Sequence, residues 1–185
     1  MKPRAQSGQS TVEFGISAVV LIFILFGLVD LGRAFYFDVG LMGAVREGAR
    51  TASWFDVSTG TNPYLYDDAI KNAVDRILEH SALPDSILEN STTTCPTPTD
   101  GNSYFNPPYA DATFPDTTNQ PELFICYENT PGLDLTTAPT DNSYKGTVVN
   151  VILVMSFGFV SGFLSGALGN SVHIVANTHM TVGGY

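Results

Sequence analysis

The residues best placed for chemistry lie at the N-terminus, where a glycine and a carboxylate precede an apolar run. Lys2 and Arg4 come before Gly8, Glu13 follows, and an uncharged, mostly apolar segment runs over residues 14–29. A secretory signal has its apolar region before the cleavage site and loses it on processing. Here the small residue comes first. Hydrolysis of the bond after Gly8 would therefore remove only a basic leader and leave the apolar segment in the mature chain.

Glu13 needs a physical reason, because a carboxylate at the edge of a hydrocarbon-spanning segment costs roughly 2–3 kcal/mol or more. One explanation is that it marks the polar edge of a signal-anchor helix and lies among the lipid headgroups. The other comes from a resemblance: the order of leader, Gly8, Gln9 and Glu13 resembles the class III signal of type IV pilins and pseudopilins. That resemblance implies that the acid faces the new α-amino group of a neighbouring subunit. Spacing alone leaves both explanations open.

The segment after Glu13 is predicted to cross a membrane once. Sixteen uncharged residues separate Glu13 from Asp30, slightly fewer than the about 20 of a free-standing span. Leu31, Gly32 and the snorkelling side chain of Arg33 complete its length. Asp30 and Arg33 are one helical turn apart and are expected to pair. The positive-inside rule places the leader in the cytoplasm and the rest of the chain outside.

The helical pattern continues beyond the predicted membrane edge. Apolar residues recur every three or four positions, which predicts one buried face: Phe35, Val39, Met42, Val45, Ala49 and Ala52. Small residues that permit close helix approach accompany them: Gly40, Gly43, Ala44 and Gly48. We predict one helix over residues 10–53, about 60 Å long at 1.5 Å per residue. Its first half would lie in the membrane and its second half under a globular head.

Three stretches of this helix resemble one family. Residues 8–14, 28–36 and 44–50 look like the TadE-like family, the pseudopilins of the tight-adherence (Tad) pilus system, which are related to the TadG-like proteins. The resemblance covers about the first 52 residues, although Phe14 stands where many such sequences have Tyr. It implies cleavage after Gly8 by a prepilin peptidase. It also implies assembly with other pilin and pseudopilin subunits and the Tad machinery, in pilus formation, secretion and adhesion.

Beyond Trp54 the pattern predicts an α+β head. An amphipathic helix over residues 67–81 is expected to pack against a sheet, and a short strand is expected near Ile87 and Leu88. A further strand is predicted over residues 123–127. The fold class is thus a long N-terminal membrane-spanning helix followed by a small extracytoplasmic sheet-and-helix head. The predicted organisation is a leader (1–8), the helix (9–54) and the head (55–185), with a Pro/Thr/Asn/Asp-rich excursion over residues 91–145.

The last forty residues allow two interpretations. Alternation over 149–157 and 172–182, with helical spacing over 160–168, predicts strand, short helix and strand. The rival is a second membrane span over residues 147–169, which lack charge and contain glycines at four-residue intervals, the spacing of helix dimers. Asn150 and several serines count against the rival. We expect strand, helix and strand.

The excursion contains cysteines, aromatic residues and acids, which are residue types found in binding sites and metal sites. Cys95 and Cys126 are the two cysteines, and an even count in an exported domain predicts a disulfide. Aromatic residues on loops can be contact residues, but we expect these to fold back onto the sheet: Tyr104, Phe105, Tyr109 and Phe114. The sequence that follows Asp100 has no glutamate at the position that an EF-hand loop requires, so no calcium site is supported.

No catalytic constellation emerges from the sequence. The three histidines, His80, His173 and His179, do not form a chelating pattern, and neither a P-loop nor a nucleophile elbow is present. We expect no metal, no cofactor and no enzyme activity. The chain has 18 acidic and 8 basic residues, which argues against nucleic acid as a partner. The alternative function is a membrane-anchored extracytoplasmic binding protein, with one span or two, that is not processed.

Overall fold

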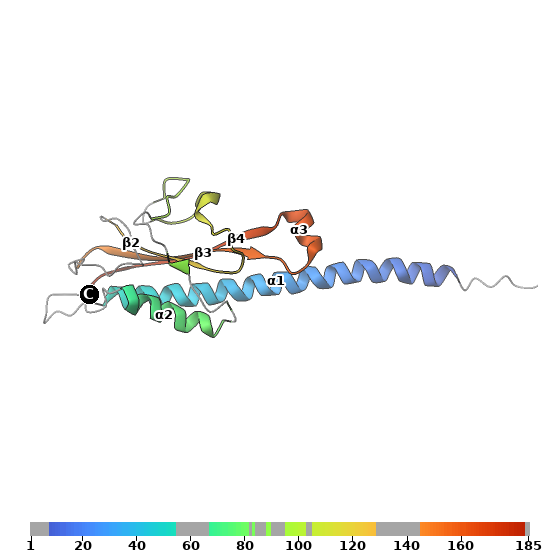
Figure 1. The fold of residues 1–185 in the computed structure, drawn as a ribbon, viewed down its shortest axis with the longest axis horizontal. Coiled ribbons are helices and arrows are strands. Elements are labelled where there is room, and N and C mark those ends of the chain that lie inside the picture. Colours follow the sequence, from blue (N-terminus) through green and yellow to red (C-terminus); the bar gives the residue numbers. More distant parts are fainter. Residues whose placement is uncertain are drawn as a thin grey trace, which may run out of the picture.

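A single long helix organises the molecule (Figure 1). The structure, a computed structural model, describes residues 8–54, 67–81, 83, 88–89, 95–102, 105–128 and 145–183. Helix α1 (Gln9–Ser53) is continuous over 45 residues, which confirms the prediction from the sequence. Its N-terminal half projects away from the rest of the chain, and its C-terminal half runs along the head (Figure 1). The fold class is α+β, as predicted.

The head is built on a sheet with the strand order β1-β2-β3-β4. Strands β2 (Glu122–Tyr127), β3 (Val148–Gly158) and β4 (Ser171–Thr181) are antiparallel, and the short β1 (Leu88–Glu89) pairs parallel to β2. Helix α3 (Gly162–Leu168) connects β3 to β4. The predicted strand, helix and strand is confirmed. The second membrane span is wrong, because residues 148–158 pair as a strand with β2 and β4.

Strand β3 is buried on both of its faces, although alternation such as that over residues 149–157 is typical of a strand with one buried face. One face packs against α1 and belongs to the main core: Val149, Val151, Leu153, Met155 and Phe157. Ile152 and Val154 point the other way, into a second cluster that contains Phe124 and Tyr109. Side chains alternate along a strand, so a sheet with one face open to water has polar residues on that face. Here described residues of the excursion cover the outer face of the sheet, and the side chains beneath them are apolar.

Described residues of the excursion before β2, within 95–102 and 105–121, pack onto the outer face of the sheet. Tyr109 is buried there, and Phe105 and Phe114 pack against the same cluster, as predicted. Tyr104 lies outside the described residues. Cys95 is joined by a disulfide to Cys126 of β2, whose side chain faces this cluster. A cross-link that closes such a loop stabilises the fold by about 3–4 kcal/mol on the chain-entropy estimate. The bond holds the start of the excursion to the sheet. A single turn of 3₁₀ helix, η1 (Asp111–Thr113), lies within it.

The buried face of α1 agrees with the predicted one at Val45, Ala49 and Ala52 and differs from it closer to the apolar half of the helix. The residues in the core are Phe37, Leu41, Ala44, Val45, Gly48, Ala49 and Ala52. Phe35 and Val39, which the sequence pattern placed on the buried face, are 63% and 71% exposed. Apolar residues occur all round this part of the helix, so periodicity does not choose between neighbouring stripes. The sheet selects the stripe that pairs large side chains with small ones, because only that stripe allows close packing.

Helix α2 (Asp67–Glu79) packs along α1 rather than on the sheet, so this part of the prediction was wrong (Figure 1). The glycines of α1 explain the contact. A Cβ added at Gly48 would lie 2.7 Å from Cγ2 of Val74 and 3.2 Å from Cγ1 of Val151. At Gly40 it would lie 2.7 Å from Oγ of Ser81. The predicted close helix approach is confirmed, and the approaching helix is α2 of the same chain.

The substitution Gly48→Ala is therefore expected to lower the free energy of unfolding of the head by about 1–3 kcal/mol, since the added methyl overpacks a rigid contact. This loss occurs although alanine favours a helix over glycine by roughly 1 kcal/mol. Thermal unfolding in detergent, followed by Trp54 fluorescence, measures the effect. Gly32→Ala is the matched control, because no atom lies within 4 Å of its added Cβ. Equal stability of Gly48→Ala and the parent chain would contradict the packing described.

Candidate processing and assembly site

The bond between Gly8 and Gln9 lies at the exposed start of α1. Gly8 is the N-cap residue, and its carbonyl accepts the first helical hydrogen bond from Val12 N at 3.3 Å. No atom lies within 4 Å of a Cβ added at Gly8. One turn further on, Gln9 Nε2 donates to Glu13 Oε1 at 3.0 Å. The predicted cleavage residues and the carboxylate therefore share one exposed helical turn.

The segment after Glu13 is apolar and uncovered by the rest of the chain. Large side chains along it are strongly exposed, from 42% for Phe23 to 74% for Phe14. Within the described ranges, α1 is the one helix long and apolar enough to cross a membrane, and its best 18-residue window has a mean hydropathy of 2.6. None of that window is buried inside the molecule. Such a surface requires lipid or other subunits as its cover.

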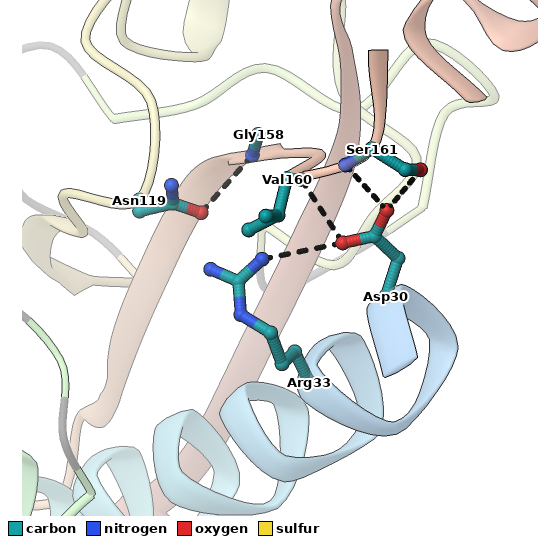
Figure 2. A network of polar contacts seen from close by, with 6 residues as sticks. All are labelled: Asp30, Arg33, Asn119, Gly158, Val160 and Ser161. Atoms are coloured by element: carbon teal, nitrogen blue, oxygen red, sulfur yellow. Dashed lines mark hydrogen bonds and ion pairs between the residues drawn. The ribbon is translucent and has the colours of Figure 1, made fainter. Parts of the chain in front are cut away.

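Asp30 ends this segment and is only 1% exposed. Its Oδ1 accepts hydrogen bonds from Val160 N at 3.0 Å and from Arg33 Nη1 at 3.3 Å (Figure 2). Its Oδ2 accepts from the backbone N of Ser161 at 3.1 Å and from the Ser161 hydroxyl. The predicted ion pair of Asp30 with Arg33 is thus present. We call Asp30, Arg33, Val160 and Ser161 the Asp30 cluster.

Two of the three partners of Asp30 in this cluster were not predicted from the sequence. Val160 and Ser161 are 130 and 131 residues from Asp30, and no local pattern links an acid on a helix to a distant strand end. The one available signal was the acid itself. A buried carboxylate must be paired and hydrogen-bonded, and Arg33 alone leaves most of its acceptor sites unused.

Arg33 extends the cluster to the aromatic core. Its guanidinium carbon lies 5.6 Å from the ring centre of Phe37 and 5.3 Å from that of Phe157. Both distances are within the range of a cation–π contact. Phe37 and Phe157 themselves pack edge to face with ring centres 5.9 Å apart. Arg33 therefore joins the carboxylate on α1 to the end of β3.

The end of β3 is also held by the excursion. Gly158 N donates to Asn119 Oδ1 at 3.0 Å (Figure 2), and Asn119 N donates to the carbonyl of Ser156 at 2.7 Å. A Cβ at Gly158 would lie 2.9 Å from Cβ of Thr118, so glycine permits this approach. The strand end that meets Asp30 is thus fixed from the opposite side as well.

The remaining polar residues named from the sequence lie apart from this cluster. His173 stacks on Phe114 with ring centres 3.8 Å apart, and His80 Nδ1 lies 2.7 Å from the carbonyl of Arg76. Asp100 accepts a hydrogen bond from Asn102 N at 3.0 Å, a local turn contact. Among the residues that the structure describes, no group of three or more His, Cys, Asp or Glu is arranged to hold a metal ion.

One hollow lies at the far end of the head, between α1 and α2. Its volume is about 630 Å³, and its lining includes Glu47, Arg50, Trp54 and Arg76. Arg50 Nε donates to Glu47 Oε2 at 2.9 Å. This hydrogen bond from Arg50 lowers the pKa of the Glu47 carboxyl below its ordinary value. The paired charges make the hollow polar as well as aromatic.

A long apolar helix that continues as the core helix of a head is the layout expected of a pilin-like spine. The comparison with protein families is more specific: residues 8–50 match the model of the TadE-like protein family. The resemblance predicted from the sequence is confirmed over this segment. The matched residues begin at Gly8 and include Glu13, Asp30 and Arg33. Comparisons with curated proteins and with solved structures find no match.

Removal of the Asp30 carboxylate is expected to loosen the junction of head and helix. Asp30→Ala leaves Arg33 and the amides of Val160 and Ser161 without their acceptor, and breaking a buried pair in this way costs about 3–5 kcal/mol. Hydrogen exchange in detergent, read on peptides that cover residues 158–164, should become faster. Asp30→Asn, which keeps the shape and one acceptor oxygen, should have an intermediate effect.

Asp38→Ala is the control for this experiment, since it removes an acid from the same helix outside the Asp30 cluster. It should leave the exchange of residues 158–164 unchanged. If Asp30→Ala exchanged at the parent rate, the head would not depend on this carboxylate for its attachment to α1.

Proposed function

We propose that this chain is a pilin-like subunit of the TadE/TadG kind, a minor pilin or pseudopilin. It would act in the assembly of a Tad or type IV-like pilus, or of its secretion apparatus, for adhesion. The observation that carries the proposal is the TadE-like match over residues 8–50, which starts at the proposed cleavage residue. The TadE-like family is structural, and the proposed role is assembly rather than catalysis.

The first proposed step is hydrolysis of the peptide bond after Gly8 by a prepilin peptidase. Water adds across the bond, so Gly8 leaves with a new carboxylate and Gln9 keeps a new α-amino group. The exposed position of Gly8 supports this step, because only one helical hydrogen bond, from Val12 N, uses its carbonyl. The apolar segment stays in the product.

The second proposed step is association through the uncovered part of α1. Glu13 would set the register by pairing with the α-amino group of a neighbouring subunit, an ion pair that offsets the roughly 2–3 kcal/mol cost of placing a carboxylate in this setting. The hydrogen bond of its side chain with that of Gln9 supports this role, because residues four apart lie on the same face of a helix. Asp30 and Arg33 would act in assembly through their own head, because the donors to Asp30 come from the same chain.

The proposed location is the cell membrane, with a single span, the N-terminus in the cytoplasm and the bulk of the chain outside. Lys2 and Arg4 support this orientation by the positive-inside rule. The disulfide of Cys95 with Cys126 supports it too, because disulfides persist in oxidising compartments. Proposed partners are the membrane, the prepilin peptidase, other pilin and pseudopilin subunits and the Tad assembly machinery.

The second candidate is a membrane-anchored extracytoplasmic binding protein with one span and no processing. The hollow near Trp54 favours it, since a cavity of about 630 Å³ is within the range of small-molecule sites. This candidate keeps the topology of the first one. It differs in the fate of residues 1–8 and in the importance of Glu13.

Processing is tested by intact mass and N-terminal sequencing of the protein from native membranes. We expect a chain that starts at Gln9. Gly8→Leu should retain the leader, because a large side chain next to the scissile bond blocks the peptidase, whereas Gly15→Leu, the same change within the apolar segment, should be processed normally. Retention of residues 1–8 by the parent chain, in a host with an active prepilin peptidase, would exclude the pilin-like role.

The role of Glu13 is tested separately from cleavage. Glu13→Gln removes the charge and keeps the hydrogen-bonding oxygen, so we expect normal processing and a large loss of subunit association. Co-purification of the variant with tagged parent chain from detergent-solubilised membranes measures this loss. Undiminished association would favour the binding-protein candidate, in which Glu13 lies among headgroups and its charge is dispensable.

A further inference from the structure

A second part of the chain lies at the same depth as the membrane edge of α1. The helix advances 17 residue steps from Glu13 to Asp30, which is a rise of about 26 Å at 1.5 Å per residue. The hydrocarbon core of a bilayer is about 30 Å thick. With Glu13 at one boundary, Asp30 therefore lies close to the other. The amides of Val160 and Ser161 are bonded to Asp30 at 3.0 and 3.1 Å, so they share its depth.

These amides begin the connection that forms the tip of the β3–β4 hairpin. The tip, with α3, points toward the apolar half of α1 (Figure 1). We call residues 159–172 the foot. It contains none of the chain's 18 acidic and 8 basic residues, which are absent from the whole of residues 146–185.

The foot also exposes large apolar side chains. Val160 is 69% exposed, Leu168 is 62% exposed and Val172 is 44% exposed. Three exposed apolar side chains around one hairpin tip are unfavourable if that tip is surrounded by water. The same arrangement is favourable where the surrounding medium is apolar.

Two of the three hydroxyl groups of the foot, those of Ser161 and Ser165, donate hydrogen bonds within the chain. The hydroxyl of Ser161 donates to Asp30, and that of Ser165 donates to the carbonyl of Gly162 at 3.0 Å. Leu164 N donates to the carbonyl of Ser161 at 3.2 Å. Internal pairing of this kind is what a low-dielectric setting requires, because water is not available there to solvate polar groups.

From depth, absence of charge and internal pairing together, we propose that the foot is a second membrane-contact surface. It inserts Val160 and Leu168 into the interfacial layer of the leaflet on the head side. The occupant of this surface is lipid, because the foot continues the lipid-exposed surface of α1. The head is then held to the membrane by the helix and the foot, which fixes its tilt. The inference requires that α1 spans the membrane, but not that the chain is cleaved or enters a pilus.

The test uses tryptophan fluorescence of the full chain in phosphatidylcholine nanodiscs, with and without bromine on the acyl chains. Trp54 is the only tryptophan, so Trp54→Phe provides a silent background. In that background Leu168→Trp should lose most of its emission in brominated lipid. Phe23→Trp, in the middle of the apolar segment, should be quenched too. Thr181→Trp, on an exposed position at the opposite end of β4, should keep its emission.

Three outcomes would overturn the inference. Full emission from Leu168→Trp, with Phe23→Trp quenched, would show that the foot stands clear of lipid. A blue shift of Leu168→Trp that grows with the number of chains per nanodisc, without bromine quenching, would identify a second copy of the chain as the occupant. Failure to quench Phe23→Trp would show that α1 does not span the bilayer and would remove the basis of the foot as well. None of these results depends on processing at Gly8.

Discussion

The burial of one carboxylate sets the relation between the helix and the head. Taking an ion out of water costs several kcal/mol unless partners replace the solvent, and Asp30 is 1% exposed. Arg33 supplies one partner from the next helical turn. The other two partners, Val160 and Ser161, follow the end of β3 in the chain and contact Asp30 only in the folded head. The Asp30 cluster therefore fixes the axial position of the head along α1. A slip of one helical turn, about 5.4 Å, would leave the carboxylate and two amides unpaired.

A second constraint acts further along the same helix. Between Gly40 and Ala52, α1 contacts α2 on one side and the sheet on another, and Gly48 meets Val74 and Val151 together. Large residues at these positions would separate the layers. The outer face of the sheet is closed by the excursion, through Tyr109 and the disulfide to Cys126. The head thus consists of α2, α1, the sheet and the excursion, and α1 is an interior element of it.

The sequence predicted what local patterns control. The extent of α1, the α2 segment, the strands at residues 123–127 and 149–157 and the C-terminal strand all followed from periodicity. The features that were not predicted depend on which elements pack together in the tertiary structure. Phe35 and Val39 satisfy the same helical period as Phe37 and Leu41, and only the sheet decides between the two stripes. We predicted that α2 packs on the sheet, whereas it packs along α1. An amphipathic pattern indicates that one face of a helix is buried, but not which element covers that face. The site divides in the same way: Gly8, Gln9, Glu13 and the pairing of Asp30 with Arg33 are local, whereas Ser161 is 131 residues away from Asp30.

Rigid attachment bears on the proposed assembly. If α1 passes from lipid into a bundle of subunits, the head must move with it, because the C-terminal half of α1 lies in the core of the head and Asp30 is hydrogen-bonded to Val160. The hydrophobic effect does not drive that passage, since lipid tails are as apolar as the side chains they contact, so helix packing has to do so. Gly15, Gly27 and Gly32 have no atom of the chain within 4 Å of an added Cβ. Their small size is therefore not used inside this molecule. On the proposed function, these positions would let a neighbouring helix approach closely, as Gly43 and Gly48 let α2 approach within the head.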